Sequence, residues 1–247
     1  KKPNANLILD SINNKEIKSK EFFNNAIKIA NFLIEKENLR RGDKLILKIE
    51  HSIIFYELII ACAIAGVVAC PVNQNINSLR LKQIKDIIKP KLTINSVKEI
   101  FYSTNSETPK NFEKFNFNQE YLIIFSSGTT SGIPKGIIHS IGNIIKSAKS
   151  FSKIGKFSSA DKFHAFWPQH HMTGIFNLFF VPLVTSAKIV FTDEFKVFLL
   201  KKLMHETKKH QITKLYLSPT MCAMAINFKK ELLPNFKFLK KTHIIST

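Results

Sequence analysis

Hydrophobic residues recur along this chain with two different spacings, and each spacing predicts a different kind of element. Residues 19–34 carry a one-sided stripe, for example Phe22, Ala26 and Ile29, whose spacing of three or four is typical of a helix packed on a core. Short continuous apolar runs such as residues 121–125 predict buried strands. The same reasoning predicts helices at 52–65, 78–89, 143–152, 195–209 and 219–229, and strands at 44–49, 67–70, 91–95, 136–139, 163–167, 187–192, 213–217 and 243–246.

Strands and helices alternate along most of the chain, and this order predicts the class of fold. A turn at 41–43 leads into a strand, a helix and a second strand, which together form a β-α-β unit. Because parallel strands are joined by such crossover helices, we expect an α/β fold with layered, largely parallel sheets and flanking helices. Ser19 and Ser78 precede helical stretches and are expected to act as their N-caps.

The composition narrows the choice of partners. The chain carries 37 Lys and Arg residues against 18 Asp and Glu residues, which gives a formal net charge of +19. These basic residues are spread from end to end, and the only arginines are Arg40, Arg41 and Arg80, so nucleic acid is not an expected partner. A basic surface of this kind attracts substrates that carry phosphate groups.

The apolar stretch 53–72 raises the alternative of a membrane span. Three residues that break up such a span lie within it, namely Glu57, Gly66 and Pro71. The three cysteines have spacings that suit neither a disulfide framework nor a zinc site, and no signal peptide opens the chain. We therefore expect a cytoplasmic protein without a membrane span.

A polar segment of ten residues, 126–135, separates the apolar run 121–125 from the run that begins at Gly136. Its glycines let backbone N–H groups turn toward a ligand, its hydroxyls add donors, and its lysine supplies a positive charge. The residues expected to bind phosphates are Ser126, Ser127, Gly128, Thr129, Thr130, Ser131, Gly132 and Lys135. The segment is not the common P-loop, because Ile133 stands where that pattern needs glycine. The alternative is a polar turn that binds nothing.

The whole string at 121–136, YLIIFSSGTTSGIPKG, resembles the signature loop of the adenylate-forming superfamily, with its pattern S/T-S-G-S/T-T-G-x-P-K-G. Two earlier stretches, RGDKLIL at 41–47 and AGVVACPVN at 65–73, resemble segments that precede this loop in the same superfamily. Ser131 makes the loop one residue longer than the usual form. The resemblance implies the N-terminal part of that superfamily's large domain, with ATP phosphates bound at the loop.

The resemblance also implies a reaction. In such enzymes a carboxylic acid attacks the α-phosphate of ATP to give an acyl-adenylate and pyrophosphate, and a thiol, usually coenzyme A, then displaces AMP. Mg²⁺ would bridge the phosphates. Relatives that activate amino acids share an F-D-x-S segment where this chain has FWPQ at 166–169, which favours an acyl or aryl acid as the substrate.

The segment from Pro168 to Gly174, PQHHMTG, resembles the superfamily's P-x-x-H-x-x-G beside the acid-binding pocket. The resemblance implies that His171 is a catalytic residue that borders this pocket and donates to carboxylate or acyl-phosphate oxygens, while Gly174 leaves room for the acyl group. A purely structural histidine is the alternative. His170 inherits no role. No metal site is expected, because neighbouring side chains in an extended segment point opposite ways and no Cys, Asp or Glu lies nearby.

The superfamily's later motifs do not occur in this sequence. We therefore expect residues 1–247 to be an incomplete N-terminal large domain of an AMP-binding enzyme, without the C-terminal small domain and without acyl-CoA synthesis of its own. The alternative function is that of a truncated, non-catalytic fragment that binds a nucleotide or a partner protein.

Overall fold

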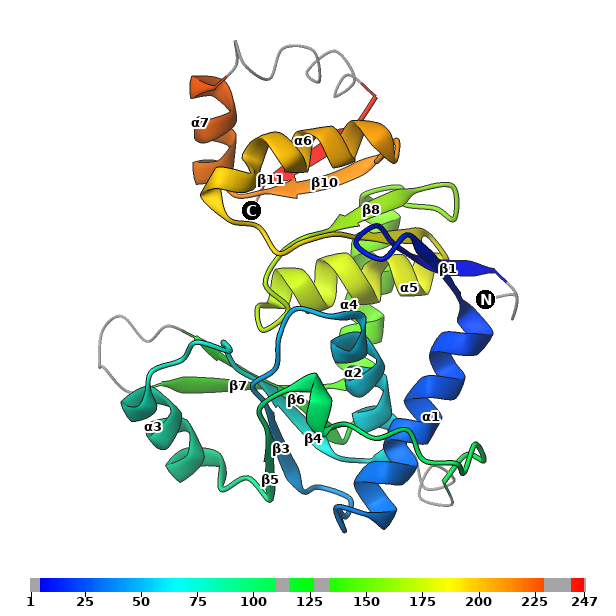
Figure 1. Cartoon of the computed structure of the whole chain (residues 1–247), viewed down its shortest axis with the longest axis vertical. Helices are drawn as coiled ribbons and strands as arrows, with labels where there is room; N and C mark the ends of the chain where they lie inside the picture. Colours follow the sequence, from blue (N-terminus) through cyan, green and yellow to red (C-terminus); the bar gives the residue numbers. More distant parts are fainter. Residues whose placement is uncertain (1–4, 110–115, 127–133, 229–240, 247) are drawn as a thin grey trace.

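The computed structural model describes residues 5–109, 116–126, 134–228 and 241–246, and its strands form two sheets (Figure 1). The order in the six-stranded sheet is β11 (His243–Ser246), β10 (Lys214–Leu217), β8 (Lys162–Ala165), β9 (Lys188–Phe191), β1 (Asn6–Asp10) and β2 (Lys15–Lys18). The order in the five-stranded sheet is β5 (Leu92–Ile94), β3 (Lys44–Leu47), β4 (Val68–Pro71), β6 (Glu120–Ser126) and β7 (Lys135–Ser140). Among these described strands, only the pairs β1–β2 and β6–β7 are antiparallel, so the expected largely parallel fold is confirmed.

Helices lie between the two sheets and on their outer faces (Figure 1). The layer between the sheets contains α1 (Ser19–Glu35), α2 (Ile53–Ala65), α4 (Ile141–Ile154) and α5 (Val181–Thr185). The outer face of the five-stranded sheet is covered by α3 (Ser78–Ile88), and that of the six-stranded sheet by α6 (Leu200–Lys209) and α7 (Pro219–Asn227). Side chains alternate accordingly, because Leu45 and Leu47 pack in the central core whereas Ile46 packs in the cluster with α3.

The apolar stretch considered as a membrane span is a helix followed by a strand. Ser52 caps α2, since its Oγ accepts a hydrogen bond from the Phe55 N–H at 3.3 Å, and Gly66 ends the helix in a left-handed conformation at φ 73°. α2 is apolar on every side because it lies between two sheets. Across the described ranges, no helix combines the length and the apolar character needed to cross a membrane.

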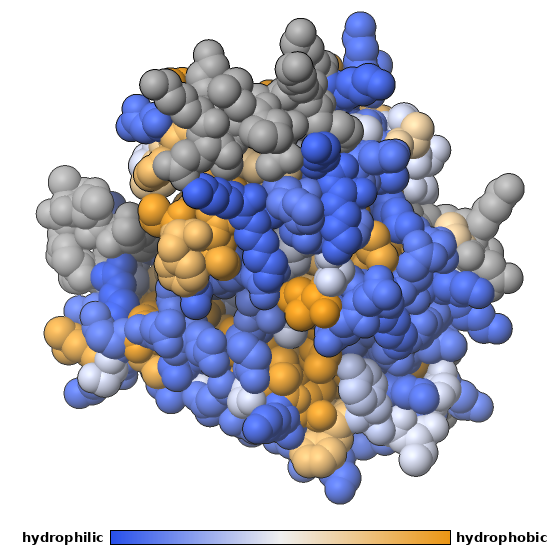
Figure 2. Space-filling view, turned by 45° about the horizontal axis from the view of Figure 1, so that its top comes forward, coloured by the Kyte–Doolittle hydropathy of each residue, from blue (hydrophilic) through white to orange (hydrophobic). Residues whose placement is uncertain are grey.

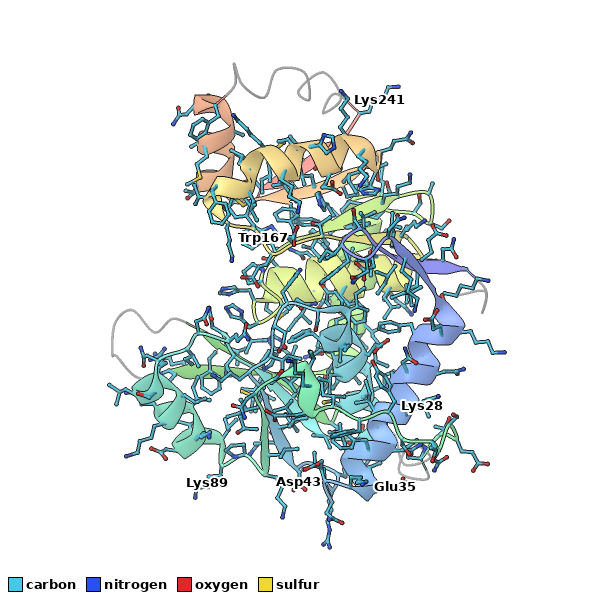
Figure 3. All side chains as sticks on the ribbon, viewed as in Figure 1. Lys28, Glu35, Asp43, Lys89, Trp167 and Lys241 are labelled. Atoms are coloured by element: carbon cyan, nitrogen blue, oxygen red, sulfur yellow. The ribbon has the colours of Figure 1, made fainter. Side chains whose placement is uncertain are left out.

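The surface is largely hydrophilic on the face shown in Figure 2, where small hydrophobic patches interrupt it. Three lysine side chains are labelled in Figure 3. Lys28 lies on α1, Lys89 follows α3, and Lys241 precedes β11. These three lysines belong to separate parts of the fold, in keeping with the scattered basic residues of the sequence.

Two of the expected helix caps are wrong. Ser19 is the first residue of α1 rather than its cap, and its hydroxyl donates to the Ala5 carbonyl oxygen at 3.1 Å. α3 is capped by Asn77, whose Oδ1 accepts from the Arg80 N–H at 2.8 Å, one residue before Ser78. At α3, serine and asparagine cap equally well, so residue type does not separate the two neighbours. At α1, the N-cap position is Lys18, whose side chain makes no capping hydrogen bond.

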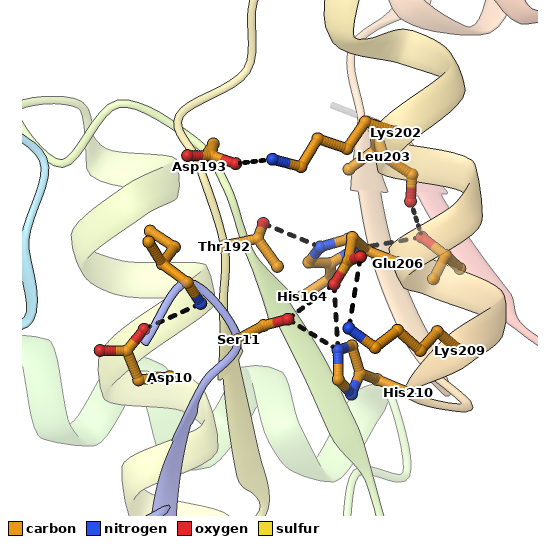
Figure 4. A network of polar contacts seen from close by, with 12 residues as sticks. Asp10, Ser11, His164, Thr192, Asp193, Lys202, Leu203, Glu206, Lys209 and His210 are labelled. Carbon is orange, nitrogen blue, oxygen red and sulfur yellow. Dashed lines mark hydrogen bonds and ion pairs between the residues drawn. The ribbon is translucent and has the colours of Figure 1, made fainter. Parts of the chain in front are cut away.

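The hairpin of β1 and β2 is absent from the sequence-based expectations, and it is joined to α6 by a polar cluster (Figure 4). Ser11 Oγ donates to Glu206 Oε2 at 2.6 Å and lies 2.8 Å from His210 Nε2. Glu206 Oε2 lies 3.0 Å from the same ring nitrogen. A catalytic triad needs serine and carboxylate at opposite ring nitrogens, so this cluster is a structural connection between the hairpin and α6.

His164 makes the stability of this fold depend on pH. The ring is fully buried, with Nδ1 3.0 Å from Thr207 Oγ1 and Nε2 3.0 Å from Thr192 Oγ1 (Figure 4). Burial lowers the pKa of His164 to about 3, whereas an unfolded histidine has a pKa of about 6.5. Between these values the unfolded state binds the extra proton, so this contribution is complete above about pH 6.5 and declines as the pH falls.

We therefore expect the free energy of unfolding to fall with decreasing pH, by up to about 1.4 kcal/mol per pH unit from this group alone. Urea unfolding between about pH 7 and about pH 5 measures the slope. His164→Gln cannot titrate and should make the slope shallower by that amount. The same slope in both proteins would show that His164 does not contribute.

Candidate functional site

The candidate phosphate-binding segment connects β6 and β7, which pair at one edge of the five-stranded sheet. Ser126 ends β6 and pairs with Lys135, the exposed first residue of β7. Both residues therefore lie in strands, and the connection is shorter than the sequence pattern predicts. The other expected phosphate ligands, Ser127, Gly128, Thr129, Thr130, Ser131 and Gly132, lie outside the described residues, so their role stays a prediction.

The turn that carries His171 is held by hydrogen bonds from two neighbouring residues. The Trp167 Nε1–H donates to the Tyr216 carbonyl oxygen at 2.8 Å, which joins the start of the turn to β10 (Figure 3). Gln169 is buried, accepts from the Ser52 N–H and donates to the Ser52 carbonyl oxygen, both at 2.9 Å. The turn is thereby joined both to the six-stranded sheet and to the start of α2.

Gly174 is required by the backbone of this turn. A Cβ atom added at Gly174 would lie 2.4 Å from the Pro168 carbonyl oxygen, closer than real Cβ contacts allow. The Gly174 carbonyl oxygen also accepts a hydrogen bond from the buried Tyr56 hydroxyl at 3.2 Å. The structure thus gives Gly174 a role in closing the turn, and its role in making room for an acyl group stays a prediction.

A π-helix, Thr173–Phe180, follows the turn and continues into α5. Its buried side chains reach the central core, where Phe179 stacks on Tyr56 with ring centroids 4.5 Å apart. π-helical turns are rare and are frequent at functional sites. The sequence predicts a change from strand to helix here but not this helical form.

The two adjacent histidines of the turn differ in their surroundings. His171 is exposed, so a place in the buried core is not supported for it, whereas His170 is half-buried. Burial, with a smaller contribution from His171, lowers the pKa of His170 to about 4, and partial desolvation also lowers the pKa of His171. A neutral imidazole keeps one N–H donor, which suits a carboxylate oxygen. The described residues contain no group of three His, Cys, Asp or Glu side chains placed to hold a metal ion.

A contact of His170 brings this turn to the same sheet edge as the phosphate-binding segment. Asn73 Nδ2 donates to His170 Nε2 at 3.4 Å. Asn73 lies two residues after the end of β4. β4 runs parallel to β6, with Ala69 opposite Leu122, so the carboxyl ends of both strands lie at one edge. Open α/β sheets bind ligands outside this edge.

Comparison with known proteins identifies the family to which this chain belongs. The family described as AMP-binding enzyme matches residues 2–243, nearly the whole chain. The chain belongs to the AMP-binding enzyme family.

This AMP-binding chain is similar to proteins named as CoA ligases, and the similarity extends over a short segment. It is 37% identical over 76 residues to a probable CoA ligase, CCL8, of Humulus lupulus and, likewise, to a malonate–CoA ligase of Arabidopsis thaliana. Each match covers 31% of this chain and 12% of the relative.

Solved structures share the fold at low sequence identity. ATP-bound MatB from Rhodopseudomonas palustris is 19% identical with a TM-score of 0.79, and the match covers 99% of this chain and 52% of MatB. The N-terminal domain of FACL13 from Mycobacterium tuberculosis is 14% identical with a TM-score of 0.81, over 99% of this chain and 71% of that one. This AMP-binding chain therefore has the fold of the N-terminal part of adenylate-forming enzymes, and it spans about half the length of MatB.

One cavity of this AMP-binding chain brings residues of two sequence motifs together with His51 and Glu194, which no motif identifies. It holds about 50 Å³ and is lined by His51, Asn73, Gln169, His170 and Glu194, among others, but not by His171. His51 follows β3 and Glu194 follows β9, so both lie at the carboxyl ends of parallel strands. Each stands two residues after the end of a predicted strand, and this position is the sequence signal that could have found them.

Proposed function

We propose that the protein carrying this chain activates a carboxylic acid with ATP and transfers the acyl group to a thiol, coenzyme A. The observation that supports this most is the hydroxyl- and glycine-rich segment between the paired residues Ser126 and Lys135, in a chain of the AMP-binding enzyme family. The same sheet edge carries the His170–His171 turn. The names of the CoA ligase relatives support the thiol as coenzyme A.

The chemistry of the segment suits the first half-reaction. Attack on the α-phosphorus needs the leaving pyrophosphate to be held in line and its growing charge to be neutralised. Backbone N–H groups, hydroxyls and the Lys135 ammonium would supply these interactions with little reorganisation. Mg²⁺, when bound, would neutralise phosphate charge. The described side chains offer no cluster of three metal ligands, so this chain's contribution to that ion would come through the phosphates it holds.

His171 would contribute to the binding of the carboxylic acid rather than to the binding of ATP. It is exposed at the turn, and its neutral ring can donate an N–H to a carboxylate oxygen. Gly174 lets the start of the π-helix approach Pro168, and this close turn would keep the His171 side chain near the edge at which the strands end.

His171→Ala should change the preference among acids in the intact protein far more than the dependence on ATP. We expect the kcat/KM for the preferred acid to fall about ten- to a hundredfold, as for the loss of one hydrogen bond to a charged group. Kinetics with two acids of different size, together with a melting curve, measure this effect.

His205→Ala is the matched control, because His205 is an exposed histidine of α6. It should leave both the acid preference and the melting temperature unchanged. A His171→Ala protein with unaltered acid preference would contradict the pocket role.

The products distinguish this function from the alternative of a non-catalytic fragment. The intact protein is incubated with ATP, Mg²⁺, coenzyme A and a panel of acyl and aryl acids, and the products are identified by mass spectrometry. We expect AMP together with one acyl-CoA. ADP as the nucleotide product, or no thioester with any acid, would favour a different reaction or a binding role.

A further inference from the structure

Gln169 lies in the turn that carries His171, and its side chain connects the two sheets. It stands shortly after the end of β8, in the six-stranded sheet, and its partner Ser52 stands shortly after the end of β3, in the five-stranded sheet. The two residues are 117 positions apart in the sequence. Their contact therefore joins the carboxyl ends of strands that belong to different sheets.

Both ends of the Gln169 amide take part in this contact. The Ser52 N–H donates to Oε1, and Nε2 donates to the Ser52 carbonyl oxygen, each at 2.9 Å. Since a backbone N–H only donates and a carbonyl oxygen only accepts, one orientation of the amide satisfies both. A single hydrogen bond would let the amide pivot, whereas two bonds to one residue fix its distance and its orientation.

Burial makes this contact costly to break. Gln169 is 3% exposed, and Ser52 is the half-buried N-cap of α2. If the turn moved away from α2, the amide and two backbone groups would lose their partners where water has little access. An apolar side chain could fill the same space, but apolar packing has no direction and would not select one orientation of the turn.

The backbone of His171 is bonded around Gln169. The His171 N–H donates to the Pro168 carbonyl oxygen at 3.2 Å, and this bond spans residues 169 and 170. The His171 carbonyl oxygen accepts from the Ile175 N–H at 3.1 Å, which links the turn to the π-helix. A displacement of Gln169 would therefore displace His171 with it.

We propose that Gln169 is a positioning residue for acid binding, because its amide sets where the His171 imidazole lies at the sheet edge. This inference rests on the proposed function, in which His171 donates to the carboxylic acid. Both ends of the amide are taken by Ser52, so Gln169 acts through His171. The phosphate-binding segment lies between β6 and β7 and does not depend on this contact.

Gln169→Met keeps the length of the side chain and removes both hydrogen bonds. In the intact protein it should lower kcat/KM for the preferred acid about ten- to a hundredfold, the cost of a misplaced reacting group. The KM for ATP should change by less than about threefold. Gln169→Glu keeps the acceptor for the Ser52 N–H, but its carboxylate cannot donate to the Ser52 carbonyl oxygen. It should show the same split and provides the test should Gln169→Met not fold.

Gln119→Met is the matched control, because the Gln119 amide also has two partners. It donates to the Gly66 carbonyl oxygen at 2.8 Å and accepts from the Arg41 guanidinium. Gln119 directly precedes β6, so these bonds lie at the opposite, amino edge of the five-stranded sheet. Gln119→Met should lower the melting temperature without changing the dependence on the acid.

A double-mutant cycle tests whether Gln169 acts through His171. In a His171→Ala protein, adding Gln169→Met should lower kcat/KM for the acid by no more than about twofold further, because the positioned group is already gone. Independent, additive losses would overturn the proposal. So would unchanged acid kinetics in both Gln169 variants, or equal losses for the acid and for ATP.

NMR titration of the imidazole rings separates this proposal from the proposed function. In Gln169→Met the resonances of His171 should shift, while those of the exposed His205 on α6 stay unchanged. A wild-type protein that activates no acid would contradict the proposed function, and shifted His171 resonances would still support the positioning of His171. Unchanged His171 resonances in a folded Gln169→Met protein would overturn it.

Discussion

Lys135→Ala should lower kcat/KM for ATP in the intact protein about ten- to a hundredfold while the fold stays intact. The loss corresponds to about 1.5–3 kcal/mol, the range for a hydrogen bond to a charged group. Lys135 is exposed at the first position of β7, so shortening its side chain leaves no cavity in the core. The backbone pairing of Lys135 with Ser126 does not depend on the side chain.

Steady-state kinetics over a range of ATP concentrations measure this effect, and a melting curve confirms folding. Lys149→Ala is the control, because Lys149 is an exposed lysine of the neighbouring helix α4. It removes the same charge at a position outside the phosphate-binding segment and should leave the kinetics unchanged. Normal ATP kinetics in Lys135→Ala would contradict a role in phosphate binding and indicate that the segment is only a polar turn.

Gly174→Ala should damage the turn that carries His171 and so lower both stability and activity. The new Cβ would lie 2.4 Å from the Pro168 carbonyl oxygen, which is backbone and cannot rotate away. The backbone must therefore shift, and we expect the free energy of unfolding to fall by about 1–3 kcal/mol, as for other overpacked sites. Because the displaced segment includes the π-helix, acid activation should fall further than the folded fraction does.

Urea unfolding and acid-dependent kinetics of Gly174→Ala test this expectation together. Thr173→Ala, at the neighbouring half-buried position, should change the free energy of unfolding by less than about 1 kcal/mol. Wild-type stability in Gly174→Ala would mean that the turn adapts at no cost. The glycine would then need another explanation, such as room for the acyl group.

Most of the fold is predictable because its strands are short apolar runs between helices. β3, β6 and β11 occur where the sequence predicts strands, and sheets closed in by helices on both faces need such runs. The hairpin of β1 and β2 was not predictable in the same way. Only Leu7, Ile8 and Leu9 are apolar in β1, and β2 contains one apolar residue, Ile17, so neither strand has a run long enough to be distinguished from a loop.

The candidate site is likewise predictable only in part. Motifs identify the segments around Lys135 and His171, because their residue order carries the chemistry. The cavity of His51 and Glu194 depends on contacts between distant parts of the chain, as when His51 Nε2 meets the Thr192 carbonyl oxygen 141 residues away. Their positions after predicted strands mark His51 and Glu194 as candidates, but no local sequence pattern predicts that these distant segments come into contact. The π-helix likewise lacks a sequence signal, and it occurs where Phe179 packs on Tyr56 and the backbone approaches closely at Gly174.

Exchange of labelled pyrophosphate into ATP by the intact protein tests the proposed activation of an acid most directly. This exchange reports reversible formation of an acyl-adenylate and needs no thiol. We predict exchange that depends on one acid of an acyl and aryl panel, proceeds without coenzyme A and falls about ten- to a hundredfold in Lys135→Ala. A folded protein that binds ATP but shows no acid-dependent exchange with any acid of the panel would contradict the proposal and favour a non-catalytic, nucleotide-binding role.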